Sequence, residues 1–108
     1  MRMTVMQCKA ARAGLGWKVS DLAARADMGQ ATVFRYENEA PNIRSFTVIR
    51  IQKALEEAGV EFLADEGNGP GLRFTERAVD EAKRARETLY VEKHDELPQT
   101  LPPGKPSG

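Results

Sequence analysis

The sequence contains few of the residues that build reactive or metal-binding sites. Among its 108 residues there is one cysteine, Cys8, and one histidine, His94. A single cysteine excludes a disulfide within the chain, and these two residues alone form no cluster of metal ligands. The sequence also shows no nucleophile paired with a base and no cofactor-binding loop. We therefore predict no enzyme activity, no cofactor and no metal.

Long apolar runs are missing as well. No stretch approaches the length of a membrane span, and no signal-peptide pattern opens the chain. With 41% hydrophobic and 30% charged residues, the composition is that of an ordinary soluble protein. We therefore expect a cytoplasmic location, no membrane partner and one domain with a modest core. No small-molecule ligand is evident from the sequence.

The chain has no net charge, with 16 basic and 16 acidic residues, but the two signs are unevenly distributed. Residues 1–53 carry nine basic and four acidic side chains, whereas the rest of the chain carries seven and twelve. A basic half joined to an acidic half fits a nucleic-acid-binding module with an attached region. The other interpretation is that these are ordinary solvent-exposed charges and that an imbalance of this size has arisen without a function.

The stretch from Val19 to Asn38 predicts two short helices joined by a tight turn. In the first helix, Leu22, Ala23 and Ala26 share one face at helical spacing. In the second helix, the inward positions are Val33 and Tyr36. The predicted outward residues are Gln30, Ala31, Phe34, Arg35 and Asn38. An outward face that mixes an amide and a guanidinium can enter a DNA major groove.

The run GWKVSDLAARADMGQATVFRYENE resembles the XRE family, the Cro/CI-type or lambda-repressor-like helix-turn-helix regulators. The resemblance covers roughly Cys8 to Leu63 and rests on LAARA, the AT pair and the YEN ending, in the family's order and spacing. It implies a mainly α fold, a lambda-repressor-like bundle. It also implies double-stranded DNA as the partner and sequence-specific transcriptional regulation as the function.

The chain departs from the family pattern at three positions. Asp27 stands at the tight turn, where the family usually has glycine, and aspartate tolerates the left-handed conformation better than most residues. Gly29 stands where a hydroxyl residue commonly caps the second helix, and glycine is a weaker cap. Val19 stands where a glutamine often opens the first helix and touches phosphate.

The resemblance also implies which residues contact DNA, because the family points the first turn of the second helix at base edges. The predicted base-reading residues are Gln30, Ala31, Thr32, Phe34 and Arg35, and those predicted to contact phosphate are Lys18, Asn38, Asn42 and Arg44. Gln30 can pair with adenine, and Arg35 with guanine or with a phosphate. Phe34 either contacts a thymine methyl or packs between elements. Simple solvation is the competing interpretation for all of them.

Arg12 stands on an otherwise apolar face of a predicted helix from Thr4 to Gly14, which Thr4 caps. In the family, an arginine at this position pairs with the glutamate that ends the recognition helix, here Glu37. A charge on such a face needs a partner in a low dielectric. We therefore predict a structural ion pair between the two, with Cys8 and Trp17 buried in the core.

The remaining elements are a helix, a hairpin and a final helix. The helix runs from Thr47, its predicted cap, to Ala58, and its polar side chains Arg50, Gln52 and Lys53 are expected to be solvated. Two alternating runs around a turn-rich segment predict a β-hairpin. The final helix extends from Thr75, its predicted cap, to about Tyr90 or Glu92. One narrow apolar stripe follows it, made of Ala78, Ala82, Ala85 and Leu89.

We therefore divide the chain into a helix-turn-helix domain over residues 1–59, a hairpin and helix over 60–93, and a Pro-rich disordered tail over 94–108. One recognition helix reads only a few base pairs, so we expect a homodimer through the hairpin and the final helix. Packing of the apolar stripe within the chain is the other interpretation. The alternative function is a protein-interaction module, such as an anti-activator, on the same fold without DNA binding.

Overall fold

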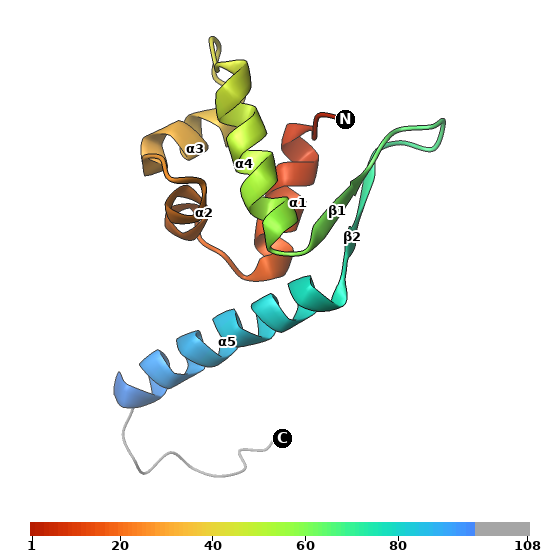
Figure 1. Ribbon diagram of the computed structural model, residues 1–108. Helices are drawn as coiled ribbons and strands as arrows, with labels where there is room; N and C mark the ends of the chain where they lie inside the picture. The colour runs from red at the N-terminus through yellow and green to blue at the C-terminus, as the bar shows by residue number, and fades with distance from the viewer. Residues whose placement is uncertain (97–108) are drawn as a thin grey trace.

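The computed structural model describes residues 1–96, with side chains described for residues 1–88. Within this part of the chain, the elements are α1 (Val5–Leu15), α2 (Val19–Ala26), α3 (Gln30–Glu37), α4 (Ser45–Glu57), β1 (Val60–Leu63), β2 (Gly71–Phe74) and α5 (Glu76–Glu96). Four helices thus precede an antiparallel hairpin and a last helix (Figure 1). The predicted mainly α fold is confirmed.

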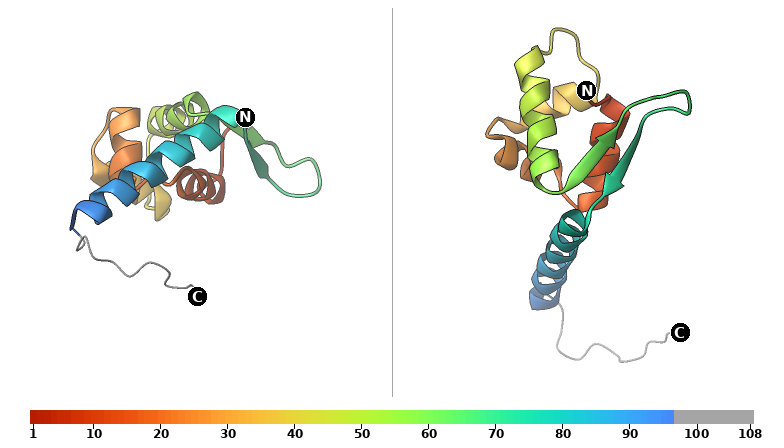
Figure 2. Two further views of the ribbon diagram at one scale, coloured as in Figure 1. Left: turned by 90° about the horizontal axis from the view of Figure 1, so that it is seen from below. Right: turned by 45° about the vertical axis from the view of Figure 1, so that its right-hand side comes forward.

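The first four helices form a bundle, with α2 and α3 on the side away from the hairpin (Figures 1 and 2). Its largest fully buried side chains include Leu15, Leu22, Ile51 and Leu55. The same core continues into the hairpin and α5 through the buried Val60 and Ala78. No helix among the described residues is long and apolar enough to cross a membrane.

Helix α1 begins at a reciprocal cap. Thr4 Oγ1 accepts the N–H of Gln7 at 3.1 Å, and Gln7 Oε1 accepts the N–H of Thr4 at 2.8 Å. Such a capping box satisfies two backbone donors that the first helical turn leaves free. The helix ends at Gly16, in the left-handed region at φ 75°. The predicted role of Thr4 as a cap is confirmed.

The predicted cap of the fourth helix is wrong. Helix α4 begins at Ser45, and the N–H of Thr47 already bonds to the Arg44 carbonyl at 3.1 Å, so Thr47 lies inside the helix with its side chain buried. At the other end of the chain, α5 continues to Glu96. Residues 94–96, which we predicted to begin the tail, are therefore helical, and residues 97–108 lie outside the described part of the chain.

The hairpin is held on α1 by one buried amide. In its register Val60 pairs with Phe74 and Leu63 with Gly71, which confirms the predicted hairpin. Gln7 Nε2 donates to the Leu63 carbonyl at 3.1 Å and to the Gly71 carbonyl at 2.6 Å, so it binds both strands at their last pair. With Thr4 bonded to Oε1, this amide has a partner for each of its polar groups.

The apolar stripe of α5 is covered within the chain. Ala78 and Ala82 are buried and Ala85 is half-buried, because α5 packs on α1 and on β2. A Cβ added to Gly16, which follows α1, would lie 3.3 Å from the Cβ of Ala85, so the two elements approach closely there. The structure thus supports intrachain packing for these three alanines, while the side chain of Leu89 lies outside the described set.

An ion pair also connects helix α5 to α2. Arg25 Nη1 lies 3.1 Å from Glu81 Oε2, and Arg84 Nη2 lies 3.1 Å from Glu81 Oε1. The hydrogen bond from Arg25 is the main reason why the pKa of Glu81 lies below its usual value. The Arg25 guanidinium also covers the face of Trp17, 4.6 Å from the ring centroid. The final helix therefore contacts the helix-turn-helix motif through Arg25.

Candidate nucleic-acid interface

The turn of the motif has the backbone geometry expected for it. Asp27 adopts φ 58° and ψ 56°, the left-handed conformation that the family usually assigns to glycine. The N–H of Met28 returns to the Ala23 carbonyl at 3.0 Å, which closes the end of α2. Gly29 then precedes α3 at φ −76°, with no side chain to cap it. The first turn of α3, like that of α4, therefore has no side-chain acceptor at its cap.

Helix α3 presents two distinct faces. Val33 and Tyr36 are buried against the bundle, and burial raises the pKa of the Tyr36 hydroxyl to about 12. The exposed residues of the helix and its cap are Gln30, Ala31, Phe34, Arg35 and Asn38, while Thr32 is half-buried. This is the division of faces that the sequence predicts. A row of side chains on the outer side of α3 is thus free of the core.

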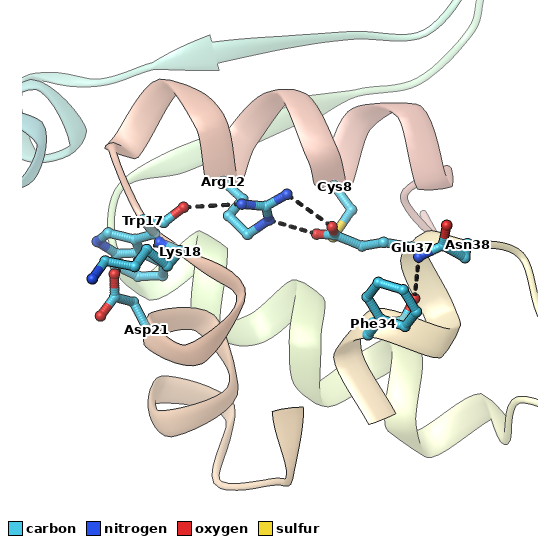
Figure 3. A network of polar contacts seen from close by, with 8 residues as sticks. All are labelled: Cys8, Arg12, Trp17, Lys18, Asp21, Phe34, Glu37 and Asn38. Carbon is cyan, nitrogen blue, oxygen red and sulfur yellow. Dashed lines mark hydrogen bonds and ion pairs between the residues drawn. The ribbon is translucent and has the colours of Figure 1, made fainter. Parts of the chain in front are cut away.

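The inner side of α3 is fixed by the predicted ion pair (Figure 3). Arg12 Nε lies 2.8 Å from Glu37 Oε2 and Arg12 Nη2 lies 2.9 Å from Glu37 Oε1, a bidentate contact. Arg12 Nη1 also donates to the Trp17 carbonyl at 3.0 Å. The side chains of Arg12 and Glu37 are 21% and 5% exposed, so the pair is largely removed from water. It connects α1, the segment before α2 and the end of α3.

Cys8 is buried beside this pair, as we predicted. Its Sγ donates to Glu37 Oε2 at 3.6 Å. Burial raises the pKa of the Cys8 thiol, and the nearby Glu37 carboxylate raises it further. A thiol in this environment stays protonated and inert. Cys8 therefore acts as a small core residue that offers Glu37 one more donor.

The residues predicted to contact phosphate are all exposed, but they are held differently. The N–H of Lys18 donates to Asp21 Oδ2 at 2.8 Å, which fixes the start of α2 and leaves the ammonium free of described partners. Asn38 Nδ2 donates to the Phe34 carbonyl at 2.8 Å (Figure 3). Asn42, at φ 66°, lies in the loop before α4, and Arg44 immediately precedes that helix.

Two of the predicted base-reading residues have environments that the sequence did not indicate. Arg35 Nη2 donates to the Pro41 carbonyl at 3.2 Å, so the guanidinium braces the loop after α3 and keeps its other donors exposed. Phe34 is 59% exposed and therefore does not pack between elements of this chain. Of the two roles considered for Phe34, only contact with an outside partner agrees with this exposure.

Two polar residues of α4 were wrongly predicted to be merely solvated. Arg50 Nη2 donates to the carbonyls of Ala26 and Asp27, at 2.9 and 2.6 Å. Gln52 accepts the N–H of Met3 at 2.8 Å and donates to the Met1 carbonyl at 2.9 Å. Both residues bind backbone carbonyls or amides from distant segments. Sequence reasoning could not predict these contacts, because every residue carries backbone carbonyl and amide groups.

A search against family models matches residues 9–62 to the helix-turn-helix family of the Cro/C1 or XRE type. The match runs from within α1 into β1 and includes the turn and all of α3. The chain belongs to this helix-turn-helix family. No curated protein and no solved structure matches the chain at a significant level. Helix-turn-helix domains of this family bind DNA and are typically non-enzymatic, which indicates a DNA partner for the chain.

Proposed function

We propose that the protein is a sequence-specific DNA-binding transcriptional regulator that places α3 in the major groove. The observation that carries this proposal is the outer face of α3. Its first turn exposes Gln30 and Ala31, while Val33, Tyr36 and Glu37 fix the other side of the helix in the core. A rigid helix with an exposed N-terminal turn is what base readout in this family requires.

The proposed roles follow from the side chains on that face. Gln30 offers a donor and an acceptor, which fit an adenine edge, and Arg35 keeps donors for guanine or for a phosphate. The exposed ring of Phe34 suits a thymine methyl. Ala31 and Thr32 are the other base-facing residues in this proposal. The proposed phosphate contacts are Lys18, Asn38, Asn42 and Arg44.

Selection of bound sequences from a random duplex pool tests this function, and two substitutions refine it. With the selected site, Gln30→Ala is expected to lower affinity by roughly 1–3 kcal/mol and to relax discrimination at one base position. Lys18→Ala is expected to lower the affinity for all DNA sequences alike and to make that affinity depend less steeply on salt concentration. Lys83→Ala, which removes an exposed charge on α5 far along the chain from the motif, is the matched control.

The outcome against this proposal is a pool that enriches no site. The same holds if Gln30→Ala and Lys18→Ala leave operator affinity unchanged while circular dichroism shows an intact fold. Those results favour the protein-interaction function, for which Phe34, Phe46 and Ile49 offer exposed apolar side chains. Binding through several phosphates weakens steeply as salt rises, whereas an apolar contact need not.

We further propose that the protein acts as a homodimer through the hairpin and α5. Two copies are needed to read two half-sites one helical turn apart. Three alanines of the α5 stripe are covered within the chain by α1 and β2. Among the side chains that the structure describes, the exposed apolar ones left for this contact in the hairpin and α5 include Leu63, Phe74 and Val79, which are 38%, 37% and 45% exposed.

Val79→Glu is expected to shift the dimer toward monomer in sedimentation, because it places a charge in a desolvated interface. Asp80→Lys, a change of charge at the next exposed position of α5, is the control. A dimer unaffected by Val79→Glu moves the interface to another surface. A wild-type chain that sediments as a monomer rules out the dimer itself.

A further inference from the structure

We infer that Arg50 is a positioning residue for DNA reading: from α4 it clamps the turn between α2 and α3 and thereby sets the orientation of α3. The inference rests on the proposed function, because it concerns how α3 reads bases. Arg50 Nη2 bonds to the carbonyls of Ala26 and Asp27, at 2.9 and 2.6 Å, so one amino group uses both of its hydrogens on the turn.

The local sequence of the turn provides few interactions that would stabilise it, so contacts from another element are needed. Asp27 stands at positive φ, which costs a non-glycine residue about 1 kcal/mol. Gly29 gives α3 no side-chain cap, and apart from its chain neighbours no atom lies within 4 Å of where its Cβ would be. At the end of α2, the N–H groups of Met28 and Asp27 bond to the carbonyls of Ala23 and Ala24, but the Ala26 carbonyl accepts no backbone hydrogen bond among the described residues. From α4, outside the motif, Arg50 binds the Ala26 carbonyl, which precedes the positive-φ residue Asp27, and the carbonyl of Asp27 itself.

The carbonyl bonds, and not the nearby carboxylate, make the clamp. Arg50 Nη2 lies 3.5 Å from Asp27 Oδ2, but that side chain is 99% exposed, and an ion pair in water contributes little. The carbonyls are short, directional acceptors on the backbone that leads into α3. A tilt of α3 moves its first turn relative to the base edges, whereas three of the four proposed phosphate contacts, Lys18, Asn42 and Arg44, lie outside α3 and its cap. Loss of the clamp should thus reduce sequence discrimination and not general affinity.

The test compares Arg50→Met with Lys53→Met in the full chain. Both remove one positive charge from exposed positions of α4, but Lys53 has no hydrogen bond among the described residues. The measurement is the ratio of affinities for the selected duplex and for a scrambled duplex, well below the melting temperature of each variant. Arg50→Met is expected to lower this ratio by roughly tenfold, the order of one lost base contact, with an unchanged affinity for the scrambled duplex. Lys53→Met should leave the ratio unchanged.

Two further variants show whether the effect comes from the carbonyl contacts of Arg50 or from its contact with the Asp27 carboxylate. Arg50→Lys keeps a donor within reach of the carbonyls and is expected to restore most of the ratio. Asp27→Asn removes the carboxylate but keeps a residue that tolerates positive φ, and it should leave the ratio unchanged.

The inference is overturned if Arg50→Met lowers the melting temperature but leaves the affinity ratio unchanged, or if it lowers the affinities for both duplexes equally. It is also overturned if Asp27→Asn lowers the ratio as Arg50→Met does. If Arg50→Met does not fold, Arg50→Lys and Asp27→Asn decide between carbonyl and carboxylate. A wild-type chain that binds both duplexes equally refutes the proposed function itself, which is a separate result.

Discussion

Arg12→Met is expected to lower the free energy of unfolding by about 3–5 kcal/mol, because it leaves the Glu37 carboxylate charged and buried without its partner. The Glu37 side chain is only 5% exposed, so it cannot turn to water in the folded state. Its other donor, the Cys8 thiol, is weak. Chemical denaturation of the variant and the wild type, followed by circular dichroism, measures the loss.

Removing the other partner should cost less. In Glu37→Leu the stranded charge is Arg12, whose side chain is 21% exposed and keeps its bond to the Trp17 carbonyl. The double variant Arg12→Met/Glu37→Leu should also be more stable than Arg12→Met, since no unpaired charge remains in the core. Equal losses in all three variants would show that the two side chains are not coupled.

Gly59→Ala is expected to destabilise the protein by about 2–6 kcal/mol, from two causes that add. Gly59 has φ +106°, where any side chain is strained by about 1–3 kcal/mol. An added Cβ would also lie 2.5 Å from the backbone nitrogen of Ala78, in the first turn of α5, and overpacking of this kind costs about 1–3 kcal/mol. Backbone atoms of a helix cannot move aside as a flexible side chain can.

Gly67→Ala separates the two causes. Gly67 lies in the hairpin loop at φ +116°, with no neighbouring atom within 4 Å of where its Cβ would be. It therefore carries the backbone strain without the collision. The melting temperature of Gly59→Ala should fall well below that of Gly67→Ala. Similar melting temperatures for the two variants would mean that α5 shifts easily and that its docking on Gly59 is loose.

Helical periodicity was sufficient to predict the faces of the motif. Leu22 and Val33 are fully buried and Gln30 is exposed, because each position on a short helix has one direction relative to the core. The pair of Arg12 and Glu37, separated by 25 residues, followed from the family resemblance. Periodicity alone marks a charge on an apolar face but does not say which distant carboxylate meets it.

The features that the sequence did not predict depend on backbone partners. Arg50 lies on the polar side of an amphipathic helix, and its acceptors are carbonyls, which every residue carries. The packing of the α5 stripe was left open for a related reason, since alanine fits many surfaces. Gly16, which follows α1, was the available signal, because a Cβ there would lie 3.3 Å from the Cβ of Ala85.

Gln7 hydrogen-bonds to the hairpin and Gln52 to the N-terminal segment, and these two contacts affect how a salt titration of DNA binding is read. An amide carries no charge at any pH, so neither contact titrates, and added ions screen it little. The contacts of α1 with the hairpin through Gln7, and of α4 with the N-terminal segment through Gln52, should consequently persist across a salt titration. The slope of log affinity against log salt would then count phosphates neutralised on the nucleic acid, without a contribution from loosening of these contacts.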